Sequence, residues 1–305
     1  MSTLKAVSSV PAAIQRVPLS QIPDNNNNVL WVDANFTQGV RNGTRQCPYA
    51  TIDAAIAKAS VGDTILIAEG HTENLSTDAI FAVDVEGLTI RGLGEGKRRP
   101  TFTSTALAGA CMITEANTVL ENLKFVANVT DGTTQAIDLA AGADGTIIRN
   151  CVFRDTSATK EFLIHIDVAT GVDNIVIEGC DFTTAAGSMT SSIFFTGTST
   201  NAVIRNNRWQ VDCEASVIDH LTGIATLIRI YNNRIVNIDV TAGLVVGVKS
   251  DSTSTGVIYD NYIQSPKSGA AVLAATADFF VAQNFASNAI NASGVLDPGA
   301  DTYAS

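Results

Sequence analysis

The stretch "VIRNNRW" (Val203–Trp209) decides the fold, because it places two adjacent asparagines inside a run that is otherwise typical of a buried strand. Asparagine is rare in strand interiors, since its amide loses water there and must find other hydrogen-bond partners. The same shape recurs along the chain. It is found in "TIRGL" (Thr89–Leu93), "VLENLKF" (Val119–Phe125), "IIRNCVF" (Ile147–Phe153), "VIEGCDF" (Val176–Phe182), "RIYNNRI" (Arg229–Ile235), "VIYDNYI" (Val257–Ile263) and "FVAQNFA" (Phe280–Ala286).

Aligned on this shape, the chain repeats every 23 to 30 residues. A period of this length indicates a repeat architecture, in which each unit packs on the next one. The column that holds the second asparagine of the opening stretch contains Leu93, Leu123, Cys151, Cys180, Asn207, Asn233, Asn261 and Asn284. The column three residues earlier is always aliphatic, and the column two residues later is mostly large and apolar. We therefore expect both of these columns to face a shared core.

The column just before the second asparagine predicts a bend. It contains Gly92, Asn122, Asn150, Gly179, Asn206, Asn232, Asp260 and Gln283. Gly, Asn and Asp tolerate positive φ angles, so we predict a one-residue corner between two strands, followed by an inward residue. Equivalent strands on successive turns pair about 4.8 Å apart. The four inward asparagines are therefore predicted to hydrogen-bond along their own column, as an asparagine ladder.

This pattern resembles the right-handed parallel β-helix of the pectin-lyase-like superfamily. The segment Trp31–Leu75, with "ATIDAAIAKAS" before "GDTILIAEGHTENL", resembles the opening of such chains. The resemblance implies an all-β solenoid of about eight to nine coils with an N-terminal capping helix. Thr51 as N-cap and apolar residues at helical spacing place that helix at about 51–60. We divide the chain into an extended docking arm (1–28), one β-helix domain (29–296) and a C-terminal tail (297–305).

Composition restricts the partners. A net charge of −11 disfavours nucleic acid, and we expect no nucleic-acid partner. No stretch has the roughly 20 apolar residues of a membrane span, so no membrane insertion is expected. The cysteines lack metal-binding spacing, and no cofactor or metal is predicted. Cys151 and Cys180 would stack at strand spacing, which is too wide for a disulfide, so we predict buried free thiols.

The candidate catalytic residues lie on a second set of aligned strands, "AIDLAAG", "HIDVATG", "SIFFTGT" and "VIDHLTG". Strict alternation places Asp138, Asp167 and His165 on the outer face, with Asp219 further along the row and His220 inward. Such a patch is suited to bind Ca²⁺ or to act as acid and base. The competing interpretation is a row of solvated aspartates on an exposed face. Phe194 interrupts the row, and the characteristic motifs of pectate lyases and polygalacturonases are missing, which favours this second interpretation.

The function that we predict is a non-enzymatic virion structural protein, such as a capsid decoration protein or a part of a head fibre or tailspike. The arm, with its prolines and "NNNN" run, would dock on other virion proteins, and a homotrimer is the expected assembly. Without a secretory signal, the chain is expected to be made in the host cytoplasm and to end in the virion, or to be extracellular if a leader has been removed. The alternatives are a polysaccharide lyase or glycoside hydrolase acting on acidic glycans, with Ca²⁺ in the lyase case, and a carbohydrate-binding surface protein.

Overall fold

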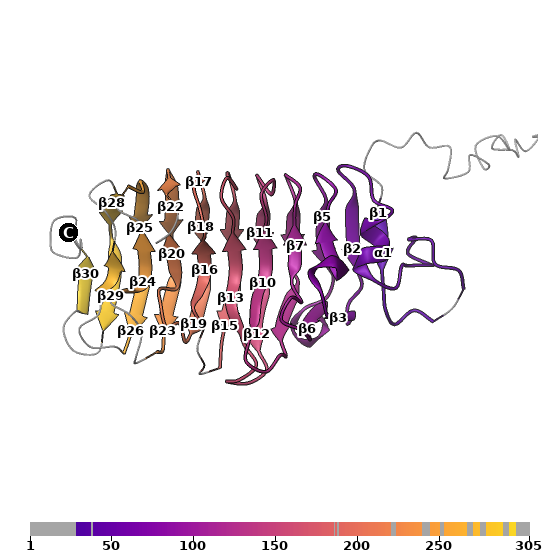
Figure 1. Ribbon diagram of the computed structural model, residues 1–305, viewed down its shortest axis with the longest axis horizontal. Helices are drawn as coiled ribbons and strands as arrows, with labels where there is room; N and C mark the ends of the chain where they lie inside the picture. Colours follow the sequence, from indigo (N-terminus) through magenta and orange to yellow (C-terminus); the bar gives the residue numbers. More distant parts are fainter. Residues whose placement is uncertain are drawn as a thin grey trace, which may run out of the picture.

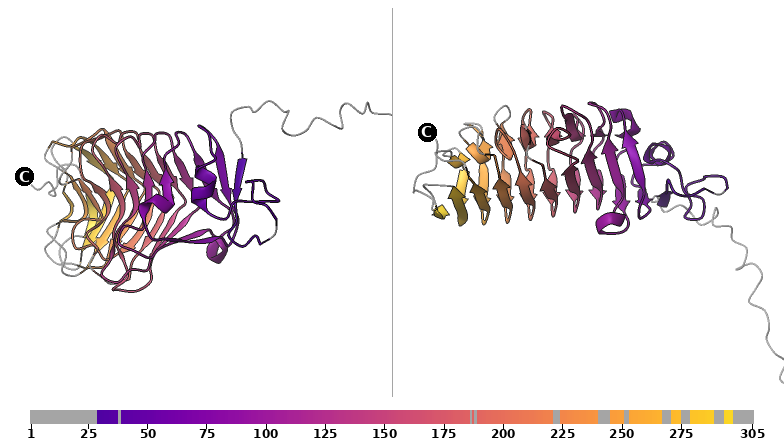
Figure 2. Two further views of the ribbon diagram at one scale, coloured as in Figure 1. Left: turned by 45° about the vertical axis from the view of Figure 1, so that its right-hand side comes forward. Right: turned by 90° about the horizontal axis from the view of Figure 1, so that it is seen from below.

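A computed structural model describes residues 29–37, 39–185, 187, 189–220, 224–239, 245–250, 253–266, 271–274, 279–288 and 293–296. The predicted arm (1–28) and tail (297–305) lie outside these residues. The described chain forms a parallel β-solenoid, an elongated rod in which three sheets run along the long axis (Figure 1; Figure 2). The number of stacked strands agrees roughly with the predicted eight to nine coils.

Each regular coil crosses the three sheets in turn, and neighbouring coils pair in parallel. The first sheet contains β1 (Val29–Val32), β2 (Thr64–Ile67), β5 (Thr89–Gly92), β8 (Val119–Glu121), β11 (Ile147–Arg149), β14 (Val176–Glu178), β18 (Val203–Arg205), β22 (Ile228–Tyr231), β25 (Gly256–Tyr259) and β28 (Phe279–Ala282). The second sheet contains β3 (Thr72–Leu75), β6 (Thr101–Ser104), β9 (Lys124–Ala127), β12 (Val152–Asp155), β15 (Asp181–Thr183), β19 (Arg208–Val211), β23 (Arg234–Asn237), β26 (Tyr262–Ser265), β29 (Asn284–Asn288) and β30 (Ser293–Leu296).

The third sheet contains β4 (Phe81–Val83), β7 (Cys111–Ile113), β10 (Thr133–Leu139), β13 (Phe162–Val168), β16 (Ser191–Phe195), β20 (Ile218–His220), β24 (Val245–Ser250) and β27 (Ala271–Ala274). A short pair, β17 (Ser199–Thr200) and β21 (Ala225–Thr226), lies in the turns between the third and first sheets. The last two strands of the second sheet, β29 and β30, pair antiparallel and so depart from the parallel stacking.

The predicted inward columns form the core. The aliphatic column on the first sheet, from Ile90 to Val281, is buried along its whole length. The column two residues after the inward position is, from Phe125 to Trp209, a stack of rings on the second sheet. Phe153 and Phe182 lie 4.6 Å apart between ring centroids, and Phe182 and Trp209 lie 4.8 Å apart with nearly parallel planes. One continuous stack of apolar side chains therefore runs along the rod.

The bend between the first and second sheets has the predicted backbone. Asn122, Asn150, Gly179, Asn206, Asn232, Asp260 and Gln283 all have φ between 53° and 64°. The next residue points inward, and there the asparagine side chains bond to one another. The Nδ2 groups of Asn207, Asn233 and Asn261 donate to the Oδ1 atom of the next asparagine at 3.2, 3.0 and 2.9 Å. Each buried amide is thus satisfied by the adjacent coil, as the repeat predicts.

The predicted alignment is wrong in one coil. Leu93 was assigned to the inward column, but it is only half-buried, and Gly92 lacks the positive φ of the bend. The inward position is taken by buried Pro100, whose carbonyl accepts from Lys124 N at 2.9 Å, just as Leu123 O accepts from Val152 N. Residues 93–99, the inserted loop, therefore form an extra segment at this corner. The loop contains the 3₁₀ turn η4 (Gly96–Arg98).

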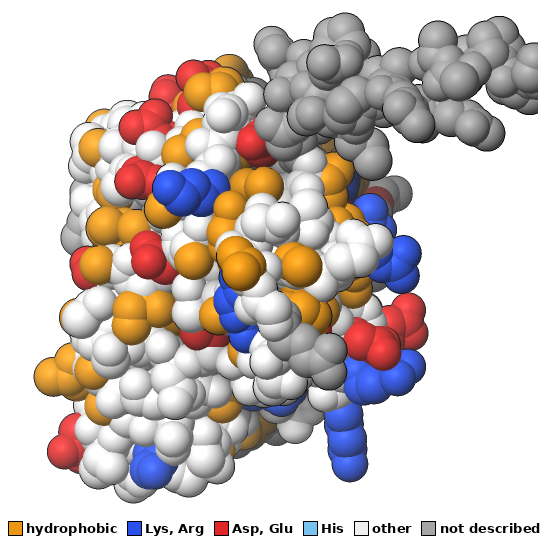
Figure 3. Space-filling model, turned by 90° about the vertical axis from the view of Figure 1, so that its right-hand side faces the viewer, with side chains coloured by type: hydrophobic (Ala, Val, Ile, Leu, Met, Phe, Trp, Pro, Cys, Tyr) orange, Lys and Arg blue, Asp and Glu red, His pale blue; other side chains and the backbone are white. Residues whose placement is uncertain are grey.

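The N-terminal end of the rod is closed by local structure. Helix α1 (Ile52–Ile56) is shorter than the predicted helix at 51–60, and it buries Ile52, Ala55 and Ile56. The predicted N-cap is confirmed, since Thr51 Oγ1 accepts from Ala54 N at 3.3 Å. The 3₁₀ turn η3 (Asp78–Ile80) lies beside this helix, just before β4. Figure 3, which looks onto this end, shows hydrophobic side chains interspersed with charged ones. None of the described helices is long and apolar enough to cross a membrane.

Candidate functional site

The predicted carboxylates share one outward row on the third sheet. Asp138 of β10 pairs in register with Asp167 of β13, and Asp167 pairs with Phe194 of β16. Phe194 pairs in turn with Asp219 of β20, and Asp219 with Lys249 of β24. The alignment therefore has the right register, including the interruption by Phe194. Asp138 and Asp167 are half-buried, whereas Asp219 is almost fully buried.

Asp138 and Asp167 are adjacent carboxylates with raised pKa values. Burial raises the pKa of Asp138, although Gln135 Nε2 donates to its Oδ2 at 3.2 Å. Burial, with the neighbouring charge of Asp138, raises the pKa of Asp167 to about 6. One oxygen of Asp167, Oδ1, is buried without a hydrogen-bond partner among the described residues. The pair therefore holds a proton more readily than two exposed aspartates do.

His165 was predicted on the outer face, and this is wrong. The side chain is fully buried, with Nδ1 2.8 Å from Ser192 Oγ, which also accepts from Trp209 Nε1 at 2.7 Å. The reason is a local break in alternation, since His165 and Ile166 both point inward, as Ala136 and Ile137 do in β10. Burial lowers the pKa of His165 to about 3, so the ring is neutral and separated by the sheet from the carboxylate row.

The other two histidines are also in the core. His220 points inward, as predicted, stacks on Phe195 at 4.0 Å between centroids, and has a pKa lowered by burial to about 3. His71 has a packing role: its Nδ1 accepts from Ala34 N at 3.1 Å, and its Nε2 lies 3.1 Å from Glu73 Oε2. The same Glu73 oxygen accepts from the first helical amide, Ile52 N, at 3.0 Å. No histidine of the chain is therefore placed to exchange protons with a ligand on the surface.

Metal-binding groups are equally sparse in the part of the chain that the structure describes, where no three His, Cys, Asp or Glu side chains converge on one point. All five cysteines are free thiols, which confirms the prediction for Cys151 and Cys180. Cys151 and Cys180 lie in the inward column next to the bend, and their thiols are directed at backbone carbonyls of the first sheet.

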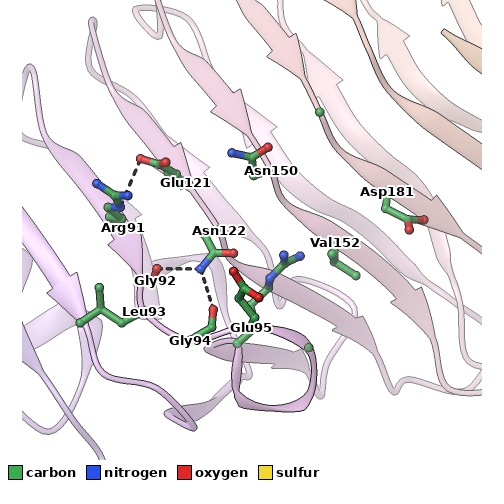
Figure 4. A pocket seen from close by; sticks show the side chains of 13 residues that line it. Arg91, Gly92, Leu93, Gly94, Glu95, Glu121, Asn122, Asn150, Val152 and Asp181 are labelled. Atoms are coloured by element: carbon green, nitrogen blue, oxygen red, sulfur yellow. Dashed lines mark hydrogen bonds and ion pairs between the residues drawn. The ribbon is translucent and has the colours of Figure 1, made fainter.

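A groove that the sequence interpretation missed lies beside the inserted loop (Figure 4). It has a volume of about 610 Å³, and its lining includes Arg91, Glu121, Asn122, Asn150 and Asp181 together with most of the loop. A second hollow, of about 380 Å³, also borders the loop. Gly96, Lys97, Arg99, Lys124, Val152 and Arg154 line it. Because Gly96, Arg99 and Val152 line both hollows, the two adjoin.

The inserted loop is held in place at both ends. At its start, Asn122 Nδ2 donates to Gly92 O at 2.8 Å and to Gly94 O at 2.9 Å, as Figure 4 shows. At its end, Gly70 N donates to Arg98 O at 2.6 Å. The Arg98 side chain also pairs with Glu69 at 3.1 Å. The glycine-rich, basic composition of "LGEGKRR" and the longest step of the repeat were the signals for this insertion.

No protein-family model matches the sequence, and no curated protein matches it. Among solved structures, the chain is similar to pectin methylesterase from Aspergillus niger, with 15% identity, a TM-score of 0.45, and coverage of 88% of this chain and 91% of that one. It is also similar to a rhamnogalacturonan lyase, with 13% identity, a TM-score of 0.39, and coverage of 88% and 89%. The Dettilon tailspike protein matches with 15% identity, a TM-score of 0.30, and coverage of 86% and 62%. Similarity at this level says nothing about sites, and the fold rests on the strand pairing of the chain itself.

Proposed function

We propose that this chain is a non-enzymatic structural component of a virion, either a capsid decoration protein or a part of a head fibre or tailspike. The observation that carries the proposal is the position of β1 at the end of the first sheet. This strand begins at Val29 and forms one end of the rod (Figure 1), so residues 1–28 join the solenoid at its tip. A segment that docks on a particle from there leaves the long faces of the rod exposed.

The outer face of the third sheet supports the same proposal. Two of the four candidate positions, His165 and Asp219, are buried, and Phe194 lies in the row between Asp167 and Asp219. The remaining pair, Asp138 and Asp167, has no histidine on its side of the sheet. We further propose that the particle carries the chain as a homotrimer, assembled in the host cytoplasm.

The test is to look for the chain on virus particles whose genome encodes it. Mass spectrometry of purified particles and cryo-electron microscopy are expected to find several symmetric copies, each with the solenoid projecting from residues 1–28. A chain of residues 29–305 added to particles that lack the protein is expected not to attach, whereas the full chain attaches. Particles without the protein, or attachment that is independent of residues 1–28, would rule out the proposal.

A second candidate function is an enzyme acting on acidic glycans, and the raised pKa values of Asp138 and Asp167 favour it. A carboxyl group that titrates near pH 6 is suited to general acid or base work. The assay is to incubate the full chain with acidic polysaccharides, with and without Ca²⁺, and to measure chain length. Cleavage that disappears in Asp167→Asn would establish the enzyme and displace the structural role.

A further inference from the structure

The second hollow beside the inserted loop, the basic pocket, is lined by four cations in a chain of net charge −11. Lys97 and Arg99 come from the loop, Lys124 from β9 and Arg154 from β12. The two strands are neighbours in the second sheet, where Lys124 pairs in register with Val152, two residues before Arg154. The repeat therefore brings together cations that are 25 to 57 residues apart in the sequence.

These cations lack enough negative partners. Arg154 pairs with Asp181 at 3.2 Å, but no salt bridge joins Lys97, Arg99 or Lys124 to any carboxylate of the described residues. The Nε group of Arg99 is buried and has no acceptor within that part of the chain. Burial lowers the pKa of Lys124, and the charges of Arg154 and Arg99 lower it further. The basic pocket therefore has an excess of donors and of positive charge, which a bound anion would relieve.

The backbone of the inserted loop and the side chain of Arg154 are held in place before any ligand arrives. The loop that carries Lys97 and Arg99 is fixed by the bonds from Asn122 and Gly70 described above. Arg154 is fixed by Asp181, since its Nη1 also donates to Asp181 O at 3.1 Å. Donors that are held in place lose little freedom when an anion binds, which favours affinity.

We propose that the basic pocket binds a terminal tetrahedral oxyanion, a phosphate or sulfate monoester, carried by a polyhydroxylated molecule. A monoester presents three free oxygens, which matches cations arriving from three segments of chain. A carboxylate, or the phosphodiester of a nucleic acid, presents only two. The adjoining groove supplies Glu121, Asn122, Asn150 and Asp181, whose carboxylate and amide groups suit hydroxyl groups on the rest of the ligand. This site is independent of the arm and of the virion role.

The experiment is calorimetric titration of the full chain with glucose 6-phosphate and glucose 6-sulfate, and with inorganic phosphate and sulfate alone. The double variant Arg99→Gln, Lys124→Gln is expected to weaken binding of the sugar esters at least about tenfold, because it removes two charge-assisted contacts. The control, Lys58→Gln with Arg229→Gln, makes the same charge change at exposed positions outside the groove, and it is expected to bind as the wild type does. Circular dichroism melts confirm that both variants are folded.

Further titrations separate the sources of the anion. A single-stranded oligonucleotide and galacturonate are expected to bind at least about tenfold more weakly than the sugar esters, because they present two free oxygens per charge. Comparison of the two esters shows whether phosphate or sulfate is preferred. The proposal is overturned if no ester binds, if the oligonucleotide or galacturonate binds as well as the esters do, or if the control loses as much affinity as the double variant. Inorganic ions that bind as tightly as the esters would reduce the pocket to an adventitious ion site.

Discussion

Asn232 and Asn233 are the same residue type at adjacent positions, yet they have different physical tasks. Asn232 has φ of 53° and turns the chain from the first sheet to the second. Asn233 is buried, where its Nδ2 donates to Ile204 O at 2.9 Å and to Asn261 Oδ1 at 3.0 Å. Its own Oδ1 accepts from Asn207 N at 3.0 Å. The first residue is thus selected for backbone conformation and the second for hydrogen bonds between coils.

This difference predicts opposite responses to substitution. Asn233→Ala should lower the free energy of unfolding by about 1–3 kcal/mol, because it leaves the buried Asn207 N without its acceptor and removes the bonds to Ile204 O and Asn261 Oδ1. Asn232→Gly should change it by much less, since glycine adopts the same backbone conformation without strain. Urea denaturation of the two variants measures both values. If Asn233→Ala were as stable as the wild type and Asn232→Gly were destabilised, residue 232 and not residue 233 would form the bonds between coils.

The thiols give a second prediction at this scale. Burial raises the pKa of Cys111, Cys180 and Cys213 above the ordinary range, so these thiols stay protonated and unreactive at neutral pH. In the native protein, iodoacetamide should modify Cys47 alone, because the other four cysteines are buried. After unfolding in urea it should modify all five. Intact mass spectrometry counts the labels, and a disulfide between Cys151 and Cys180 would contradict the structure.

Asp167 provides a pH prediction. Its pKa is about 6 in the folded chain against an ordinary value of 3.8, so the folded state holds a proton that the unfolded state releases. The associated stability is fully present below pH 3.8 and is lost as the pH rises through 6. Asp167→Asn, which imitates the protonated form, should therefore melt higher than the wild type at pH 8 and the same near pH 4.

The buried histidines have the opposite effect on the pH dependence of stability. This effect is the same in the wild type and in Asp167→Asn, so it cancels when their melting temperatures are compared. Their pKa values of about 3 lie below the ordinary 6.5, so His165 and His220 reduce stability as the pH falls through that window in wild type and variant alike. The matched control is Asp84→Asn, at an exposed position. It should leave the melting temperature unchanged at both pH values, and an equal rise for both variants would contradict the role of burial.

At the scale of strands and loops, the period of the repeat predicted more than alternation did. Comparison of equivalent residues gave the register of Asp138 and Asp167 correctly, because the strands pair one coil apart. Alternation within a single strand failed at His165, since two consecutive residues of β13 turn inward. The aligned strands contained a signal for this second inward position. The column just before the inward isoleucines holds small or polar residues, Ala136, His165 and Ser192, and all three are buried. The groove was missed for a related reason, since aligning Leu93 instead of Pro100 concealed the inserted loop.

The inserted loop should be separable from the fold. A variant that deletes residues 93–99, with Gly92→Asn and Pro100→Leu, restores the corner sequence of the other coils. Its free energy of unfolding should change by no more than about 2 kcal/mol, since the lost contacts are at the surface and the removed loop is short. Circular dichroism and urea denaturation measure this. Failure of the shortened chain to fold would show that the loop, and not Pro100, completes this coil.

At the scale of the whole molecule, a solenoid is stable only where its ends are closed, because each coil contacts only its neighbours. The N-terminal end is closed by residues that follow Val29. Helix α1 packs against β1, β2 and β4. The free edge of β1 is covered by the segment that follows it, since Trp31 N donates to Gly43 O at 2.8 Å and Tyr49 N donates to Trp31 O at 2.7 Å. Both the core and the strand edge are thus protected by described residues that follow Val29.

This closure predicts that the arm is dispensable for folding. A chain of residues 29–305 should unfold in one cooperative transition, with a melting temperature within a few degrees of that of the full chain, because the described solenoid core and its cap are intact. Differential scanning calorimetry of both chains makes the comparison, with Thr51→Ala in the full chain as a control that weakens the cap itself by about 1 kcal/mol. If truncation lowers the melting temperature more than Thr51→Ala does, residues 1–28 belong to the cap, and their proposed role in attachment must be separated from a role in folding.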